Sequence, residues 1–325
     1  MKPWFLLALA LAAAPAAAPR AAPDTPLDLQ GHRGARGLLP ENTLPAFQRA
    51  IELGVTTLEL DIAITSDGVL VISHDPALNP DLTRDASGRF LEQRGPAIST
   101  LTWAQLQTYD VGRIKPGTDY ARQFSEQIPV DGTRIPRLAD LFDLVKRSGD
   151  DRVRFAIETK LTPDKPEETP LPEPFARAVV EEIRKAGMAR RSQILSFDWR
   201  SLQVVQKIAP EIETVYLTAQ QRWLDNVGAA RAEGSRWTAG FQYRDHGSIP
   251  KMIRAAGGTL WSVHFRDLDA QKVKEAQSLG LKVLAWTVND PAVMARMIGY
   301  GVDGLITDRP DLARKLLEER GIRWR

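Results

Sequence analysis

The residues best suited to catalysis in this 325-residue chain are two histidines that are associated with short apolar runs. His32 comes directly after the run 27–31, and His74 ends the run 69–74. An imidazole titrates near neutral pH, so a pair of them can supply a general base and a general acid in one turnover. If both side chains reach one site, the sequence predicts acid–base catalysis there.

Three carboxylates occupy alternating positions in two further runs. Glu59 and Asp61 alternate with apolar residues in the run 58–62, and Glu158 ends the run 153–158, which alternates in the same way. Because side chains alternate between the faces of a strand, we expect the apolar residues to face outer helices and the carboxylates to face one interior. Buried like charges repel unless a cation neutralises them, and all-oxygen ligands without cysteine favour Mg²⁺ or Ca²⁺ over zinc. The sequence therefore predicts a divalent cation held by Glu59, Asp61 and Glu158.

Two basic residues accompany these acidic groups. Arg33 directly follows His32, and Lys160 lies two residues after Glu158. Fixed positive charge at such positions suits a phosphate oxygen. The alternative is a purely structural role, in which Lys160 pairs with Glu158 and Arg33 pairs with Asp61. The convergence of histidines and carboxylates favours the functional interpretation.

The elements that would carry these residues alternate along the chain. Short β-branched or apolar runs are separated by stretches with apolar residues at helical spacing, such as Leu44, Phe47 and Ile51. Eight repeats of strand and helix predict an α/β fold, a TIM (β/α)8 barrel, whose reactive groups lie at the carboxyl ends of the strands. An open doubly wound sheet is the alternative, but no G-x-G-x-x-G sequence follows a strand. The predicted strands are 27–31, 56–62, 153–158, 193–196, 214–217, 259–263, 282–286 and 303–306.

A ninth strand and an insertion interrupt this alternation. Asp67 and Gly68 are typical of a two-residue hairpin turn and predict an antiparallel strand over 69–74. With that turn, the pairing register would place Asp61 opposite His74, with both side chains on one face. Residues 76–137 are rich in glycine, proline and polar residues and predict a small inserted subdomain with one helix near 103–109. Because the insertion begins at the barrel mouth, we expect it to cover the mouth.

Residues 1–22 have the pattern of a cleaved signal peptide. Lys2 precedes the apolar run 4–14, and small residues follow at 16–18. The run has 11 residues, whereas about 20 are needed to cross a bilayer, so we expect no stable membrane anchor. The prediction is export to the periplasm, with 23–325 as the barrel domain. A net charge of +2 gives no field for nucleic acid, and the lack of cysteine excludes a disulfide scaffold and a thiol nucleophile.

The motifs, taken in order, resemble those of the glycerophosphodiester phosphodiesterases. The segments "HRGARGLLPENT", "ELD" and "SHD" are similar in order and spacing to the H-R, E-x-D and H-D signature of that family. The segments "ETK" (158–160), "SFD" (196–198), "AWTVN" (285–289) and "GLITDRP" (304–310) extend the resemblance over nearly all of the chain after the signal peptide. The resemblance therefore implies an exported bacterial member of this family.

The same resemblance implies an activity, the metal-dependent hydrolysis of glycerophosphodiesters such as glycerophosphocholine or glycerophosphoethanolamine. The products would be glycerol 3-phosphate and an alcohol. Which histidine is the acid stays open, as does whether the nucleophile is water or the substrate's adjacent hydroxyl. The implied roles are acid–base catalysis by His32 and His74, binding of Ca²⁺ or Mg²⁺ by Glu59, Asp61 and Glu158, phosphate binding by Arg33 and Lys160, and a face for the glycerol carbons at Trp286.

Two other classes of function remain as alternatives. A phospholipase C-like or lysophospholipase D-like enzyme would use the same mouth on a lipid, but residues 76–137 show only scattered apolar residues for a lipid-binding rim. A non-catalytic periplasmic binding module would have no need of two titrating groups beside a metal site. The expected partner is thus a small-molecule substrate and not nucleic acid, and the oligomeric state is left open.

A few further residues have competing interpretations. Glu41 and Asn42 open the first helix, where they would either cap it or contact the site from behind. Asp75 is expected to orient a neighbour, and His264 follows the strand 259–263 and could lie at the edge of the mouth. Three tryptophans at predicted helix starts are interpreted as core residues or as hydrophobic-staple residues of those helices: Trp103, Trp199 and Trp223.

Overall fold

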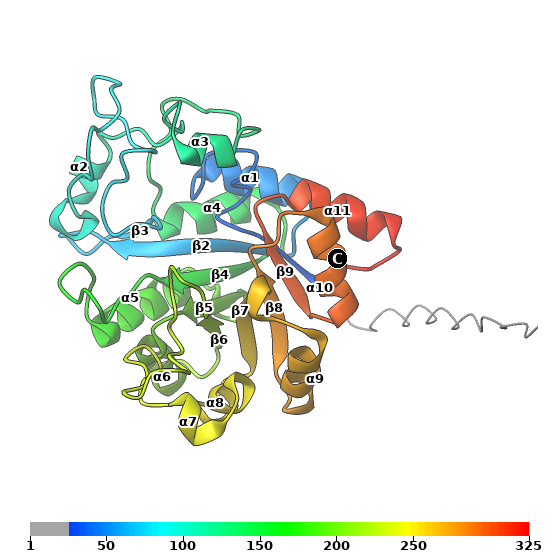
Figure 1. The fold of residues 1–325 in the computed structure, drawn as a ribbon. Coiled ribbons are helices and arrows are strands. Elements are labelled where there is room, and N and C mark those ends of the chain that lie inside the picture. Colours follow the sequence, from blue (N-terminus) through cyan, green and yellow to red (C-terminus); the bar gives the residue numbers. More distant parts are fainter. Residues whose placement is uncertain (1–25, 325) are drawn as a thin grey trace, which may run out of the picture.

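Eight parallel strands form a closed barrel in a computed structural model that describes residues 26–324 (Figure 1). Neighbouring strands pair around the ring, and β1 closes it by pairing with both β2 and β9. The predicted TIM barrel is therefore confirmed, whereas the predicted signal peptide lies outside the described residues. The ring strands are β1 (Asp28–Gly31), β2 (Thr57–Ile64), β4 (Arg154–Thr159), β5 (Ser192–Ser196), β6 (Glu213–Thr218), β7 (Leu260–His264), β8 (Lys282–Trp286) and β9 (Gly304–Thr307).

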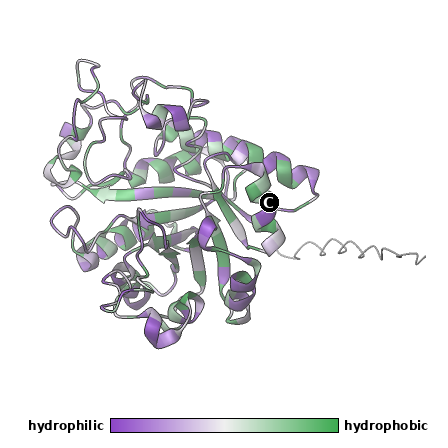
Figure 2. Cartoon of the chain, viewed as in Figure 1, coloured by the Kyte–Doolittle hydropathy of each residue, from purple (hydrophilic) through white to green (hydrophobic). Residues whose placement is uncertain are grey.

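Helices cover the outside of the barrel. Each of the longer helices turns an apolar stripe toward the strands, as Phe47 and Ile51 of α1 do, and keeps its polar side in solvent. In Figure 2 hydrophobic and hydrophilic residues alternate along the outer helices, and much of the barrel strands is coloured hydrophobic. The helices that follow strands are α1 (Leu44–Glu52), α4 (Leu138–Ser148), α5 (Pro172–Lys185), α6 (Trp199–Ile208), α7 (Tyr243–His246), α8 (Ile249–Ala255), α9 (Ala270–Ser278), α10 (Pro291–Tyr300) and α11 (Pro310–Glu319). Among the described residues, no helix is both long enough and apolar enough to cross a bilayer.

Alternation along the strands separates two apolar layers. Leu58, Leu60 and Ile62 belong to the large cluster between strands and helices, as predicted. A second cluster fills the barrel interior, so the polar groups at the C-terminal ends of the strands stand on an apolar floor. The buried members of this inner cluster are Ala156, Leu195, Val215, Leu217, Leu260, Leu284 and Ile306.

The hairpin forms, but its predicted register is wrong by one residue. Strand β3 (Leu70–Ile72) pairs antiparallel with β2 outside the ring, with Ile62 opposite Ile72. The backbone N–H of Ser73, not of His74, donates to the carbonyl of Asp61 at 2.9 Å. The cause is a turn of three residues, closed by the hydrogen bond from Thr65 N to Val69 O, in which Gly68 takes a positive φ of 80°. His74 follows the last paired residue of β3, so the pleat does not fix the direction of its side chain.

The insertion 76–137 lies between β3 and α4, at the end of the barrel toward which β2 points (Figure 1). It contains α2 (Trp103–Leu106), which is shorter than the predicted helix, and α3 (Asp119–Gln123), which was not predicted. Leu78, Ile98 and Ile135 form a small apolar cluster with residues of the hairpin. The insertion therefore packs on the hairpin that leads to His74.

Candidate active site

Three carboxylates from two neighbouring strands meet at the C-terminal end of the barrel. Glu59 and Asp61 stand on β2, and Glu158 stands on β4 in register with Asp61. All three are buried, and one oxygen of each lies within 4.8 Å of the others. Burial, followed by the charges of Asp61 and Glu158, raises the pKa of Glu59 well above its usual range, and burial raises the pKa of Glu158 to about 7. These crowded oxygens fit a hard divalent cation, which would relieve their repulsion.

Arg33 and Lys160 reach the same carboxylates and are ion-paired with them. Arg33 Nε lies 3.3 Å from Asp61 Oδ2, and Lys160 Nζ lies 2.8 Å from Glu158 Oε1 and 3.6 Å from Asp61 Oδ1. Although burial opposes it, these two cations hold the pKa of Asp61 well below its usual range. The salt bridges considered as an alternative therefore exist, yet both basic side chains also line the cavity described below. Their contact with a phosphate stays a prediction.

A tight turn after β1 directs His32 and Arg33 toward these carboxylates. Arg33 itself has a positive φ of 50°, and its backbone N–H donates to Glu59 Oε2 at 2.8 Å. Gly34 has a φ of 86°, and a Cβ atom at Gly31 would lie 2.2 Å from the Gly34 carbonyl oxygen. Only glycine adopts a positive φ without steric cost, and only glycine lacks the Cβ atom that would clash at position 31. The glycines on either side of the His-Arg pair therefore make this turn possible.

His32 is held by a buried aspartate from the other end of the chain. Its Nδ1 lies 2.6 Å from Asp308 Oδ1, and its Nε2 lies 3.9 Å from Glu59 Oε2. Arg36 binds both oxygens of Asp308, at 2.8 and 3.0 Å, and Asn289 Nδ2 donates to Oδ2 at 2.6 Å. Burial lowers the pKa of His32 to about 4. A neutral ring beside the Asp308 carboxylate donates from Nδ1, which leaves the Nε2 lone pair on the side of the carboxylates.

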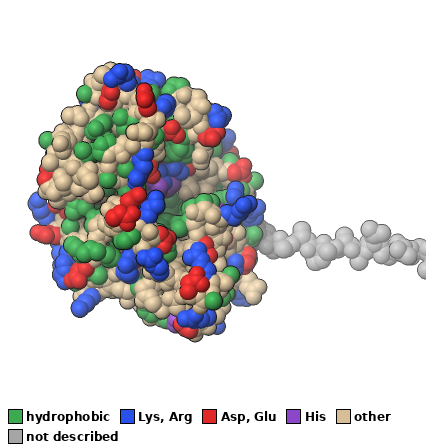
Figure 3. All heavy atoms as spheres, turned by 60° about the vertical axis from the view of Figure 1, so that its left-hand side comes forward, with side chains coloured by type: hydrophobic (Ala, Val, Ile, Leu, Met, Phe, Trp, Pro, Cys, Tyr) green, Lys and Arg blue, Asp and Glu red, His purple; other side chains and the backbone are tan. Residues whose placement is uncertain are grey.

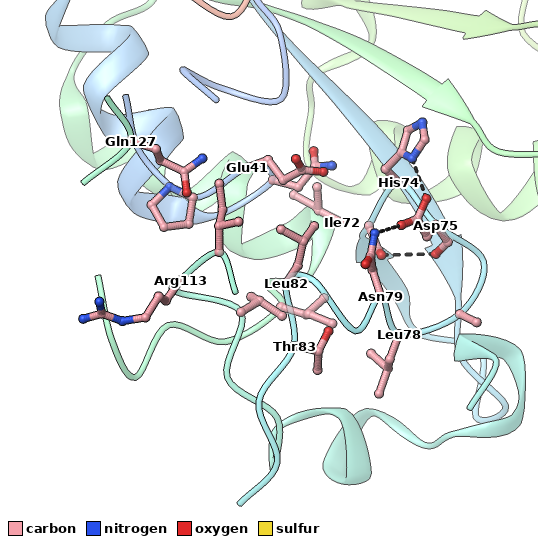
Figure 4. Close-up of a pocket in the computed structure, with 17 residues that line it drawn as sticks. Glu41, Ile72, His74, Asp75, Leu78, Asn79, Leu82, Thr83, Arg113 and Gln127 are labelled. Carbon is pink, nitrogen blue, oxygen red and sulfur yellow. Dashed lines mark hydrogen bonds and ion pairs between the residues drawn. The ribbon is translucent and has the colours of Figure 1, made fainter. Parts of the chain in front are cut away.

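His74 has a similar partner but a more open position. Its Nδ1 lies 2.8 Å from Asp75 Oδ1, and Asn79 Nδ2 donates to Asp75 Oδ2 at 2.7 Å, as the dashed lines in Figure 4 show. The His74 side chain is 33% exposed, compared with 12% for His32. Burial lowers the pKa of His74, and His74 and Asn79 lower the pKa of Asp75 to about 2 against the effect of burial. The structure therefore places Asp75 where the predicted orienting role requires it.

Glu41 and Asn42 contact the site from behind. Asn42 Nδ2 donates to Asp61 Oδ2 at 2.9 Å, and Arg33 Nη1 donates to Glu41 Oε1 at 2.7 Å. The side chain that caps α1 belongs to Thr43. Glu41 and Asn42 thus contact residues of the site and do not cap the helix, which is the second of the two predicted alternatives.

The two histidines and two of the three carboxylates, Glu59 and Glu158, border one cavity of about 610 Å³. Figure 3 looks onto this end of the barrel and shows histidine atoms in a hollow among acidic and basic side chains. Much of the remaining cavity lining is apolar and comes from the loop after β4 and from later strands and loops; we call it the apolar wall. Its members include Leu161, Leu195, Phe197, Leu217, Trp223, Leu224, Trp237, His264, Trp286 and Ile306.

Aromatic rings stack edge to face along this apolar wall. Trp286 contacts Phe197 at a centroid distance of 5.4 Å, His264 at 5.1 Å and Trp223 at 6.1 Å. Trp286 borders the cavity, as does His264, which the sequence placed at the edge of the mouth; contact of Trp286 with glycerol carbons stays a prediction. The prediction that Trp223 is a core residue is wrong, because it sits in the loop after β6 with 61% of its surface exposed. Trp199 is fully buried, as predicted.

Sequence reasoning missed the residues that hold His32. Asp308 and Asn289 directly or closely follow β9 and β8, inside the segments "GLITDRP" and "AWTVN", and Arg36 lies in "HRGARG". A polar residue at the carboxyl end of a barrel strand is a recognisable signal for a site residue. Applied to all eight strands, that signal identifies Asp308 and Asn289, whereas Arg36 becomes apparent only from its contacts.

A sequence model of the Glycerophosphoryl diester phosphodiesterase family matches residues 32–312. The chain belongs to this family. Among glycerophosphodiester phosphodiesterases, the protein of Caldanaerobacter subterraneus subsp. tengcongensis is 29% identical over 294 residues, which cover 89% of this chain and 97% of that protein. The Bacillus subtilis enzyme is 26% identical over 291 residues, covering 88% of this chain and 84% of that protein.

Solved structures with the glycerophosphodiester phosphodiesterase fold superimpose on this chain. A structure from Silicibacter pomeroyi DSS-3 with the same family assignment has a TM-score of 0.83 and 34% identity, covering 94% of this chain and 97% of that one. A phosphodiesterase of Oleispira antarctica, solved with the product sn-glycerol-3-phosphate, has a TM-score of 0.63 at 22% identity, covering 90% and 97%, and shows the shared fold.

A pH-dependent response to cations tests the carboxylate cluster of this phosphodiesterase. Protons compete with a cation for Glu158, whose pKa is raised to about 7, so binding should tighten as the pH rises through that value. We expect the increase in Tm caused by Ca²⁺ or Mg²⁺, relative to chelator, to grow from about pH 6 to about pH 8. In the metal-free protein, Glu158 ionises as the pH rises through about 7, and this lowers the Tm because a buried charge is costly. The fall in the Tm of the metal-free protein is part of the same increase in the cation response. Differential scanning fluorimetry measures both curves.

The matched control is Glu168→Gln on the loop after β4, where Glu168 pairs with Arg94. It should keep the cation response, and Glu158→Gln should abolish it. A cation response that Glu158→Gln retains would contradict the assignment of Glu158 to the cation site.

Proposed function

We propose that this chain is a phosphoric diester hydrolase that converts glycerophosphodiesters to glycerol 3-phosphate and an alcohol. The observation that carries the proposal is the placement of two histidines, each with Nδ1 beside an aspartate, around a cavity that is also bordered by two members of the three-carboxylate cluster. Membership of the family and the named activity of relatives support the substrate class. The glycerol phosphate bound in the Oleispira antarctica phosphodiesterase supports the identity of the product.

The basic residues would hold the phosphate group. Arg33 and Lys160 border the cavity and carry fixed charge, so each can turn from its carboxylate partner toward a nonbridging oxygen of the diester. When bound by Glu59, Asp61 and Glu158, a divalent cation supplies Lewis-acid charge that offsets the negative charge growing on the phosphoryl oxygens. We propose Ca²⁺ or Mg²⁺, because all three ligands are carboxylate oxygens.

The histidines would move the protons. With Nδ1–H donated to its aspartate, each ring presents Nε2 to the cavity, which is the geometry of a positioned acid–base group. The ring that is neutral accepts the proton of the attacking hydroxyl on Nε2, and the other ring, which must enter the step protonated on Nε2 as well, donates that proton to the departing alkoxide. Trp286 and Phe197 give the glycerol carbons an apolar surface, whereas the hydroxyls remain on the polar side.

Replacing either catalytic histidine tests the acid–base assignment. We expect His32→Ala and His74→Ala each to lower kcat by about 10²-fold with the fold preserved, because proton transfer by a positioned side chain contributes about that much. His246→Ala is the matched control, since His246 lies on α7 among the described residues and does not border the cavity. Circular dichroism checks the fold, and a near-normal kcat in either variant would remove that histidine from the mechanism.

Product analysis tests the substrate class and the cation together. Protein depleted of metal with chelator should not hydrolyse glycerophosphocholine, and Ca²⁺ or Mg²⁺ should restore the release of glycerol 3-phosphate and choline, detected by ³¹P NMR. Phosphatidylinositol in parallel separates this activity from that of a phospholipase C. Full turnover in excess chelator would contradict the metal requirement, and cleavage of the lipid alone would contradict the substrate class.

We propose that residues 1–22 direct export to the periplasm, as their charge and apolar pattern indicate. Expression of the full chain in a Gram-negative host should yield an osmotic-shock fraction whose N-terminus, determined by Edman degradation, lies within residues 19–23. A protein that keeps residues 1–22 and stays with the cytosol would contradict this proposal.

A further inference from the structure

The insertion 76–137 contacts the supports of both histidines. The two histidine–aspartate pairs come from different parts of the fold, one after β1 and β9 and one after β3, and both histidines border the cavity. In each pair one aspartate oxygen faces Nδ1 of the ring, and the other oxygen is held by a separate side chain. The insertion supplies that side chain in one pair and packs on it in the other.

On the His74 side the support is Asn79. Its Nδ2 donates to Asp75 Oδ2 at 2.7 Å, and its own Oδ1 accepts the backbone N–H of Asp81 at 2.9 Å (Figure 4). The backbone carbonyl of Asn79 also accepts from the N–H of Leu82 at 3.1 Å. Asn79 is therefore fixed by its own turn before it reaches Asp75. This matters because the Asp75 side chain is 37% exposed, so water competes for its free oxygen.

On the His32 side the support is Arg36, which binds Asp308 through two hydrogen bonds. Three residues of the insertion enclose Arg36. Its Nη1 donates to the Tyr120 hydroxyl at 3.2 Å, and its guanidinium lies 4.5 Å from the centre of the Phe124 ring. Gln127 Nε2 donates to the Arg36 carbonyl at 2.7 Å. The insertion thus fixes both the backbone and the side chain of Arg36.

We propose that Asn79 and Arg36 are positioning residues, through which the insertion fixes the orientation of both histidine rings. A carboxylate held at only one oxygen can rotate about its side-chain bonds, and the ring that it binds rotates with it. Holding the second oxygen fixes the plane of the carboxylate and hence the direction of Nε2. The inference rests on the proposed function, because the rings need a fixed direction only if they transfer protons.

The first test is Asn79→Leu, which removes the amide donor and keeps a similar size. We expect kcat to fall by about 10-fold, in line with the loss of outer supports around other sites, while KM for glycerophosphocholine and Tm change little. The ring ¹⁵N signals of His74 should shift or broaden in the metal-free protein. Asn79→Gln, which retains an amide donor, should recover part of the kcat.

A double-mutant cycle shows whether Asn79 acts through Asp75. If it does, Asn79→Leu should have no further effect on kcat in an Asp75→Ala background. Gln107→Leu is the matched control, because the Gln107 amide donates to the Ile135 carbonyl within the insertion and touches neither pair. It should leave kcat and the histidine signals unchanged.

Arg36→Met provides the corresponding test for His32, because it keeps the length of the side chain and removes its hydrogen bonds. We expect a loss of kcat with little change in KM, and a shift of the His32 ring signals and not of those of His74. Its effect should vanish in an Asp308→Ala background.

The outcomes separate this inference from the proposed function. Normal kcat in both His32→Ala and His74→Ala would contradict the function itself. If those variants are inactive but Asn79→Leu and Arg36→Met keep wild-type kcat and unshifted ring signals, the positioning inference is wrong. Equal losses in the single variant and in the aspartate background would also overturn it, because the residue would then act by another route.

Discussion

The repulsion among three buried carboxylates is the constraint on which the rest of the site depends. Glu59, Asp61 and Glu158 converge within 4.8 Å on an apolar floor, where like charges are costly. Ion pairs with Arg33 and Lys160 partly offset that cost. Arg33 lies in the turn after β1, where it has a positive φ, and Lys160 directly follows β4. A cluster of buried carboxylates that must be neutralised by neighbouring cations does not by itself stabilise the fold. Binding of a divalent cation explains why the three carboxylates are placed together.

The two histidines around this centre are supported to different degrees. The His32 side chain is only 12% exposed and contacts Asp308, which itself has two further donors from separate elements. His74 is more exposed, and its partner is its neighbour in sequence. His32 is thus positioned by the ends of barrel strands, whereas His74 is positioned by the hairpin and the insertion. Both rings nevertheless share one arrangement, in which Nδ1 lies beside an aspartate and the ring borders the cavity.

Strand periodicity accounts for what could be predicted from the sequence. The alternation around Glu59, Asp61 and Glu158 gave the correct inward face, because a side-chain period of two leaves only two choices, and the repeated strand–helix pattern gave the barrel. The hairpin register failed since a two-residue and a three-residue turn share the signal at Gly68, and one residue is enough to change the pairing. Trp223 was misplaced because local sequence does not tell which apolar residue a loop carries into solvent. Arg36 could not be assigned, because its partners Asp308, Tyr120 and Phe124 are remote in sequence.

The pairing of β1 with β9 joins the two ends of the barrel and brings His32 against Asp308, 276 positions later in the chain. A ribosome must therefore have released almost the whole polypeptide before that histidine gains its partner. Nascent and prematurely terminated products would carry the "HRG" and "ELD" segments without a working centre. The support of His32 is therefore complete only once β9 has closed the ring.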